Sequence, residues 1–393
     1  MSRAKLRILA AAAGTAALAG VTEVSGQVQE QRLADPVTSF PQEFGMVSGL
    51  LELPGGRVMV ADPLGQVLVV LDMAAGTADT IGRVGQGPKE YRQPDGLFWL
   101  PGDSVMLVDL GNGRLTVLDP DLEFGETTPI AQGSPRSGNM MIRMPSWLDS
   151  YGRAYFQRMM GRMRPNGEMA DSADVLRWDR STGAVDTIGM VKLQEVSVTR
   201  GGSANNQMVS MSPKPLSPQD GWAAGSDGRV VMVRSIDYHV DWVESDGQVV
   251  SGPPVDFEPV RVRNPDKEAW VDNLSSSGMS ISMQNVNGQI TTSFSRGGSR
   301  GTRDAVDSYE WPDVMPAFRA NRVRVAPDGT AWVERYVSAG SPVTFDVFDQ
   351  AGRLTKQVIL PPGRRIAGFG EGVLYAVNSD ELDLQWLEKY KLN

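Results

Sequence analysis

The sequence predicts an all-β fold in which one four-stranded unit repeats around a ring, and three observations support this prediction. Residues 49–72 align with residues 96–119 without a gap at an offset of 47, and 12 of the 24 positions are identical. Short alternating apolar runs, divided by turns rich in Gly and Asp, continue along the chain and are typical of β-strands. Self-similarity with a period of roughly 40–50 residues is the pattern that the blades of a β-propeller produce.

Six copies of the unit can be followed along residues 27–393, each with a turn, a β-rich run, a hairpin and an apolar run that ends on an acidic residue. Blades one and two are the aligned pair. The weaker copies are centred on residues 151–156, 227–233, 328–334 and 372–377, which we assign to blades three to six. The sequence therefore predicts a six-bladed β-propeller.

The sixth copy reaches the end of the sequence without an outer strand of its own. Residues 28–33 precede blade one, have a strand-like composition and belong to none of the six copies. We expect them to close the ring as the outer strand of blade six, because closure removes an open sheet edge.

Two insertions interrupt the repeat. The first covers residues 157–172 inside blade three, and the second covers residues 264–317 between blades four and five. The second begins with a predicted helix over residues 265–274, because Pro265 suits a first helical turn and acidic residues favour a helix N-terminus. The Ser-, Gly- and Asn-rich stretch that follows, residues 275–303, predicts a loop.

Residues 1–26 have the order of a secretory signal peptide. Three basic residues precede an apolar run over residues 8–21, and short side chains at residues 24–26 form a cleavage site. The apolar run is too short and too rich in alanine for a membrane-spanning helix. We therefore expect an exported protein, periplasmic or extracellular, without a membrane span.

Composition excludes several kinds of site. The chain has no cysteine, which removes disulfides, zinc–thiolate centres and a catalytic thiol. Removal of residues 1–26 moves the formal charge from −9 to −11, so the mature chain is poorly suited to nucleic acids and anionic membranes. The expected partners are a protein, a peptide or a small-molecule ligand, and the expected oligomeric state is a monomer.

A family resemblance rests on two segments. Residues 108–115 (Val-Asp-Leu-Gly-Asn-Gly-Arg-Leu) resemble the NHL-type repeat signature, and residues 81–94 resemble an inter-blade connection of exported bacterial six-bladed propellers of that group. The resemblance covers nearly all of residues 37–393, but its specific motifs lie only in blades one and two. It implies a six-bladed ring and no single function, since such relatives include peptide-binding sensors, interaction modules and metal-dependent lyases.

Four repeated carboxylates could be mistaken for catalytic pairs. Asp62 and Asp109 are repeat equivalents, each placed before a tight hairpin, and Asp72 and Asp119 are a second equivalent pair. A carboxylate in such a position accepts hydrogen bonds from backbone N–H groups of the turn. We therefore interpret all four as structural.

His239 is the only histidine and lies on an expected strand of blade four. This position favours an ordinary strand residue over a member of a Ser-His-Asp relay, which requires a defined geometry. The lyase branch of the resembling group needs several histidines for its metal, so that activity is not carried over to this chain.

Seven of the nineteen methionines fall within thirty residues. Thioethers can bind Cu(I), but methionine is also an adaptable packing residue, and no Cys or His supports a copper site here. Packing is therefore the preferred interpretation of Met140, Met141, Met144, Met159, Met160, Met163 and Met169.

Propellers bind ligands at one face, where inter-blade connections meet the inner strands around the channel mouth. Two connections, residues 85–95 and 310–319, combine polar and aromatic side chains. Together with Arg83, which lies two residues before the first connection, they supply the candidate ligand-binding residues Arg83, Tyr91, Arg92, Asp95, Trp311 and Arg319. The alternative interpretation is that Tyr91 and Phe318 wedge between blades while the charged residues form weak ion pairs at the rim.

These observations favour an exported binding or interaction module that holds a peptide, a protein surface or a small ligand at the channel mouth. No catalytic residue, metal ligand or cofactor is assigned. The alternative is a hydrolase or lyase of the lactonase-like kind that uses a central divalent cation. Calcium is the candidate ion, although no run of residues has the alternating acidic spacing of a dedicated calcium loop.

Export gives the first testable expectation. The mature protein should begin at Gln27, because the cleavage site is formed by the short side chains of residues 24–26. N-terminal sequencing of protein recovered from the periplasm or the medium measures this directly. Recovery of that protein with Met1 still present would contradict the signal-peptide interpretation.

Overall fold

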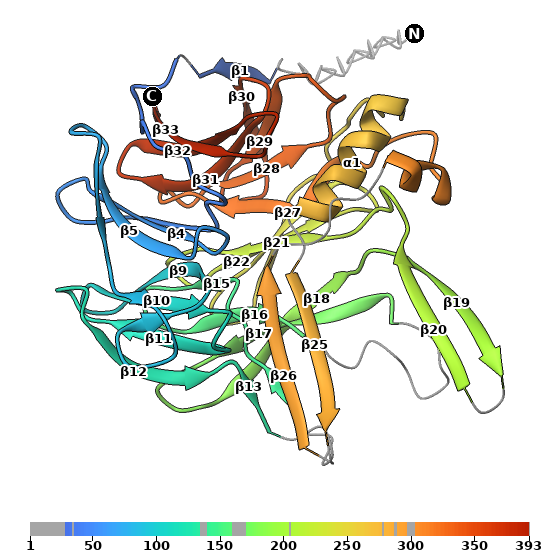
Figure 1. Cartoon of the computed structure of the whole chain (residues 1–393). Helices are drawn as coiled ribbons and strands as arrows, with labels where there is room; N and C mark the ends of the chain where they lie inside the picture. The colour runs from blue at the N-terminus through green and yellow to red at the C-terminus, as the bar shows by residue number, and fades with distance from the viewer. Residues whose placement is uncertain are drawn as a thin grey trace, which may run out of the picture.

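The computed structural model describes residues 28–33, 35–133, 140–158, 170–203, 206–276, 279–286, 289–296 and 303–392. Figure 1 shows β-sheets arranged around a central axis, with one helix, α1 (Asn264–Ser276), beside the ring. Six sheets of four or five strands form the blades. The prediction of a six-bladed β-propeller is confirmed.

Blades one to three each consist of four antiparallel strands that follow one another in chain order. Blade one contains β3 (Gly49–Glu52), β4 (Val58–Asp62), β5 (Val67–Asp72) and β6 (Thr77–Thr80). Blade two contains β9 (Pro94–Leu100), β10 (Ser104–Asp109), β11 (Arg114–Leu118) and β12 (Phe124–Pro129). Blade three contains β15 (Trp147–Leu148), β16 (Ala154–Gln157), β17 (Ser172–Trp178) and β18 (Val185–Lys192).

Blades four to six continue the same order. Blade four contains β21 (Gly221–Ala224), β22 (Val230–Arg234), β23 (His239–Val243) and β24 (Val249–Ser251). Blade five contains β27 (Phe318–Val325), β28 (Ala331–Arg335), β29 (Val343–Phe348) and β30 (Leu354–Leu360). Blade six contains β31 (Arg364–Gly370), β32 (Val373–Ser379) and β33 (Gln385–Lys391), with a fourth strand from near the N-terminus.

The N-terminal segment joins the ring at two places. β1 (Gln29–Arg32) pairs in parallel with β30 and adds a fifth strand to blade five. β2 (Thr38–Ser39) pairs antiparallel with β33 and completes blade six. The prediction that residues 28–33 close blade six is therefore wrong, because the short segment that leads directly into blade one takes that edge.

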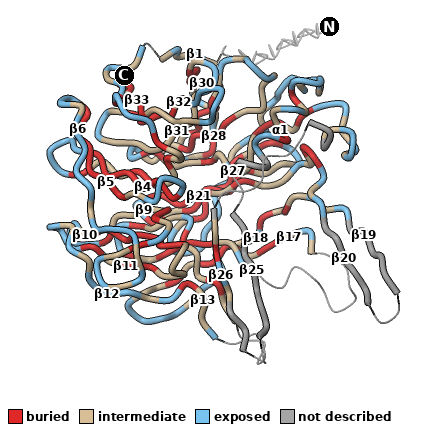
Figure 2. Tube along the Cα trace, viewed as in Figure 1, coloured by how far each residue is buried: buried red, intermediate tan, exposed pale blue. Residues whose placement is uncertain are grey.

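The blades are held together by apolar side chains buried between adjacent sheets. Figure 2 shows the strands near the middle of the ring as mostly buried, while the turns at its rim are exposed. One cluster joins blade one to blade six through Phe40, Phe44, Val58, Tyr375 and Leu387. Burying a side chain of this size contributes about 1.5–3 kcal/mol.

The long connections all leave one face of the ring. Strands that follow one another along the chain within a blade are antiparallel. The links between blades therefore emerge on the same side as the hairpin between the second and third strands of each blade. Additional strands in the links are β7 (Arg83–Val84), β8 (Glu90–Tyr91), β13 (Ala131–Gln132), β14 (Met141–Ile142), β19 (Val196–Ser203) and β20 (Asn206–Pro213). We call this side the insertion face.

The link between blades four and five is the most elaborate. It contains α1, the hairpin of β25 (Met279–Val286) and β26 (Gln289–Arg296), and the 3-10 helix η2 (Arg303–Ser308). The helix predicted over residues 265–274 is present. The predicted loop over residues 275–303 instead includes the β25–β26 hairpin.

The hairpin reaches blade two. Phe294 of β26 is buried in an apolar cluster that includes Leu110, Leu115 and Ile130. A Cβ built on Gly113 would lie 3.7 Å from the Phe294 ring, which places the two segments in contact. Of the insertion predicted inside blade three, residues 159–169 lie outside the described residues.

Closure of the ring makes a stability prediction. Phe40→Ala should lower the free energy of unfolding by about 3–5 kcal/mol, because the side chain is 1% exposed between blades one and six. Val37→Ala is the control, since Val37 is 65% exposed in the same segment and should change stability by less than about 0.5 kcal/mol. Urea unfolding measures both variants, and equal effects would show that this segment does not hold the ring closed.

Candidate functional site

The repeated carboxylates stabilise the blades. Asp62 accepts hydrogen bonds from the backbone N–H groups of Gly45 and Met46, at 2.7 and 3.0 Å. It also accepts from the two turn N–H groups that follow it, at 3.0 and 2.7 Å. Asp109 occupies the equivalent position of blade two and accepts a hydrogen bond from Arg92 N–H at 3.0 Å. Arg92 lies 47 residues after Gly45, so the repeat includes the donor as well as the acceptor. The structural interpretation is confirmed.

The outer carboxylates have turn contacts as well. Asp72 accepts from the N–H groups of Ala74 and Ala75, each at 2.9 Å. Asp119 accepts from the N–H groups of Asp121 and Glu123, at 3.0 and 2.9 Å. These bonds close the hairpin between the third and fourth strands, so they position no group toward a ligand.

Four of the six candidate residues lie in the link between blades one and two. Arg83 is exposed and pairs with Glu90 at 2.8 Å. Tyr91 is 1% exposed, packs between the two blades and accepts a hydrogen bond from Leu68 N–H at 3.1 Å. Arg92 is exposed, whereas Asp95 is buried at the start of the inner strand β9. Two of these side chains are therefore buried and two are exposed, so the four do not share one environment.

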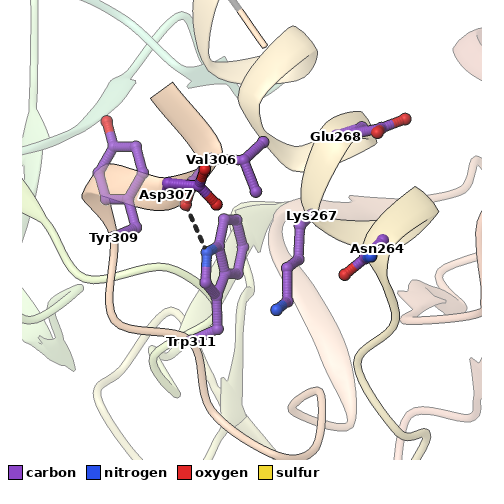
Figure 3. A pocket seen from close by; sticks show the side chains of 7 residues that line it. All are labelled: Asn264, Lys267, Glu268, Val306, Asp307, Tyr309 and Trp311. Carbon is purple, nitrogen blue, oxygen red and sulfur yellow. Dashed lines mark hydrogen bonds between the residues drawn. The ribbon is translucent and has the colours of Figure 1, made fainter. Parts of the chain in front are cut away.

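Trp311 belongs to a pocket in the link between blades four and five. The pocket has a volume of about 380 Å³, which is within the usual range for small-ligand sites. Figure 3 shows Trp311 beside Lys267 of α1, with Tyr309 on the other side of the indole in this view. The lining residues are Asn264, Lys267, Glu268, Val306, Asp307, Tyr309 and Trp311.

Two aromatic rings, those of Tyr309 and Trp311, line the Trp311 pocket, and Trp270 packs against both from behind. Trp270, Tyr309 and Trp311 contact one another edge to face, with ring centroids 5.2–6.0 Å apart. The Trp311 indole N–H donates to the carbonyl of Val306 at 2.9 Å, and the Lys267 ammonium lies 5.7 Å from the indole centroid. The pocket therefore presents flat apolar surface next to a positive charge.

A buried carboxylate fixes α1 against blade five. The carboxylate of Asp266 accepts hydrogen bonds from Arg263 N–H at 2.9 Å and from Ala339 N–H at 2.6 Å. The first bond satisfies an N–H group that precedes the helix, as in a capping box, and the second ties the helix to the β28–β29 hairpin. Asp266 thus positions the wall of the Trp311 pocket on the ring.

Arg319, the sixth candidate, begins a row of arginines on the inner strand of blade five. Its guanidinium pairs with Glu334 at 3.1 Å and covers the ring of Tyr336 at 4.3 Å. Arg322 approaches the other oxygen of Glu334 at 4.0 Å. Val323 faces the opposite side of β27, into the core between blades four and five.

Arg324 lies at the axis of the ring. It donates to the carbonyl of Ile366 in blade six at 3.2 Å, and its guanidinium is 5.7 Å from the ring centroid of Trp147 in blade three. Blades three and six are opposite each other in a six-bladed ring, so a side chain that contacts both must lie near the centre. Arg319, Arg322 and Arg324 form what we call the arginine row.

Burial changes the acidity of the arginine row. Loss of solvent lowers the pKa of Arg322, and the neighbouring charge of Arg319 lowers it further. Burial lowers the pKa of Arg324 to about 10, with a further contribution from Arg322. With a pKa of about 10, Arg324 remains charged at neutral pH, in surroundings that solvate a charge poorly.

Sequence reasoning included Arg319 and missed Arg322 and Arg324. A signal was present, since basic residues alternate with Val323 and Val325 as the faces of a strand do. Recognising it required knowing that this strand is the innermost one of its blade. The sequence pattern does not provide that placement.

The other sequence hypotheses can be placed. Both His239 nitrogens face carboxylates, at 2.7 Å from Asp237 and 3.2 Å from Asp241, and the Ser251 hydroxyl donates to Asp241. This arrangement is not a serine–histidine relay. Met140, Met141 and Met144 pack against the apolar cluster of blades two and three, while Met159, Met160, Met163 and Met169 lie outside the described residues.

Within the described residues, no group of three or more His, Asp or Glu side chains is arranged to hold a metal ion. No helix among them has the length and apolar character needed to cross a membrane.

The fold and this geometry define a six-bladed propeller with a structured insertion on one face. Its fold resembles that of a DUF4221 family member from Bacteroides vulgatus (10% identity, 91% of this chain and 96% of that one, TM-score 0.47). It also resembles the calcium-binding protein regucalcin from Agrobacterium tumefaciens (12% identity, 93% of this chain and 98% of that one, TM-score 0.36). A third structure with a similar fold is virginiamycin B lyase from Staphylococcus aureus (10% identity, 91% of this chain and 99% of that one, TM-score 0.39).

These similarities concern the fold alone and transfer no residue roles. No protein-family model and no curated protein matches the chain. The assignment to the NHL-repeat-like group therefore stays a prediction.

The attachment of α1 can be tested through Asp266. Asp266→Ala should speed amide hydrogen exchange in residues 263–276, because Arg263 N–H and Ala339 N–H lose a buried acceptor worth about 1–3 kcal/mol each. Exchange in blade one should not change. Asp313→Ala, an exposed carboxylate of the same link, is the control. Unchanged exchange in Asp266→Ala would show that other contacts hold the helix.

Proposed function

We propose that this chain is an exported binding module that holds a small ligand or a peptide on its insertion face. The observation that carries the proposal is the Trp311 pocket, which combines the rings of Tyr309 and Trp311 with Lys267 at the side of the propeller where the long links emerge. Aromatic walls supply apolar contact area, and a few polar groups beside them fix a ligand's orientation.

Blade five supports the proposal from the ring itself. Arg319 begins the inner strand only eight residues after Trp311, and it belongs to the arginine row that reaches the axis. The link therefore delivers an aromatic anchor and a cationic anchor to the same region of the molecule. Arg92, exposed in the link between blades one and two, adds further positive charge to the insertion face.

The test uses a charge removal that leaves the aromatic wall in place. In Lys267→Gln, the affinity for the retained ligand should fall by about tenfold or more, because an anchor at the centre of a site contributes roughly 2 kcal/mol. Purified protein is exposed to an extract of the source cells, retained small molecules and peptides are identified by mass spectrometry, and the affinity of each is then measured by calorimetry.

Lys214→Gln is the matched control. Lys214 pairs with Glu195 in the link between blades three and four, and both side chains are 49% exposed. Both variants should keep the melting temperature of the parent protein, since exposed substitutions change stability by about 0.5 kcal/mol or less. A parent protein that retains no ligand, or equal affinities for the parent and Lys267→Gln, would overturn the assignment of the site.

A further inference from the structure

The arginine row carries more positive charge than its surroundings neutralise. In the described part of the chain, the ion pairs of Arg319 and Arg322 both go to Glu334, and Arg324 contacts only a carbonyl and an indole ring. Three guanidinium groups therefore share one carboxylate. The imbalance amounts to two positive charges on one inner strand.

This imbalance is unfavourable in the absence of an anion. The side chains of Arg319 and Arg322 are 29% and 23% exposed, and the Glu334 side chain is 12% exposed. Charges removed from water need opposite charges or hydrogen-bond partners, and like charges placed close together repel one another. A guanidinium has five N–H donors, and the row uses few of them within the protein.

The positions of the three arginines suit a ligand that enters from the insertion face. Arg319 is nearest to the link that precedes β27, and Arg322 and Arg324 follow in the direction of the strand. Arg322 and Arg324 point to the same side of the strand, roughly 7 Å apart along it. Both side chains are partly exposed, which leaves donor groups accessible to a small molecule.

We propose that the arginine row binds a compact dianionic group of a small ligand, held by Arg322 and Arg324 at the axis of the ring. The two excess positive charges match two negative charges, and guanidinium groups bind such oxyanions through paired N–H donors. A phosphate monoester and a pair of neighbouring carboxylates offer this same chemistry. The inference rests on the proposed binding function and specifies the chemical class of its ligand.

The experiment measures anion affinity by calorimetry at fixed ionic strength, with inorganic phosphate and malonate as the two probes. Constant ionic strength separates specific binding from general screening of charge. The wild-type protein should bind one equivalent of at least one probe, and the tighter of the two identifies phosphate or dicarboxylate chemistry. Arg322→Gln and Arg324→Gln should each weaken that binding by about tenfold or more, because each removes a charge-assisted hydrogen bond.

A substitution of opposite sign distinguishes binding from a structural role. Glu334→Gln removes the one internal carboxylate of the row and should tighten anion binding. Arg353→Gln is the control for loss of an arginine, since Arg353 is 68% exposed and pairs with Asp349 in the β29–β30 hairpin, which lies on the opposite face. A structural ion-pair cluster would not produce opposite changes in affinity for the Glu334 and Arg322 variants.

Thermal unfolding provides a second measurement for the same variants. Phosphate or malonate should raise the melting temperature of the wild type and not that of Arg322→Gln, because a ligand stabilises only the state that binds it. In buffer without either anion, Arg322→Gln should melt no lower than the wild type, since it relieves repulsion. A lower melting temperature there would indicate a structural role and contradict the proposal.

The outcomes also separate this inference from the proposed function. If the wild type retains a ligand through Lys267 and Trp311 but binds neither probe, the anion assignment is wrong and the binding function stands. If the wild type binds a probe and Arg322→Gln binds it equally well, the anion lies elsewhere and the assignment to this row is wrong. Loss of binding in both arginine variants, with Arg353→Gln unchanged, supports the proposal.

Discussion

Closure of the ring is the constraint on which the rest of the structure depends. Each blade is a sheet whose two faces need neighbours, and blade six obtains its outer strand only when Thr38 and Ser39 pair with β33. Phe40 and Phe44 then stack on each other, with ring centroids 6.1 Å apart, and fill the space between blades one and six. Val47 N–H adds a hydrogen bond to the side chain of Gln385 at 2.8 Å. A closed ring gives the six inner strands fixed positions, so side chains from blades that are distant in sequence can meet at the axis.

The contacts of Arg324 with blades three and six follow from that closure. In an open sheet the Arg324 guanidinium would be exposed to water, which solvates an arginine well. In the closed ring it lies between Trp147 and the carbonyl of Ile366, and burial lowers its pKa to about 10. The fold thus raises the energetic cost of an unneutralised charge, which is the condition under which an anionic ligand gains most from binding.

Local patterns in the sequence predicted the blades because the bonds that define them are local. The 47-residue offset reappears in the hydrogen bonds of Asp62 and Asp109, whose backbone donors are also 47 residues apart. Closure was mispredicted because it depends on which distant sheet edge a segment pairs with. Residues 28–33 have a more strand-like composition than the two-residue β2, yet β2 pairs with the edge of blade six. The candidate site stays a prediction, and the sequence indicates only part of it for the same reason. The link between blades four and five suggests Trp311 and Arg319, whereas the roles proposed for Arg322 and Arg324 depend on the position of β27 within the ring.

The link between blades four and five is attached at both of its ends and at intermediate points, and this explains how a long segment can carry a defined site. Asp266 ties α1 to blade five, Phe294 anchors the hairpin on blade two, and the N–H of Met315 donates to the carbonyl of Val260 at 2.8 Å. Tyr336 N–H then bonds to the carbonyl of Ala317 at 3.1 Å, which joins the end of the link to the strand that carries Glu334. The aromatic wall and the arginine row are therefore connected through blade five by backbone hydrogen bonds. A ligand long enough to contact both would meet two surfaces positioned by one sheet, so little conformational freedom would have to be lost on binding.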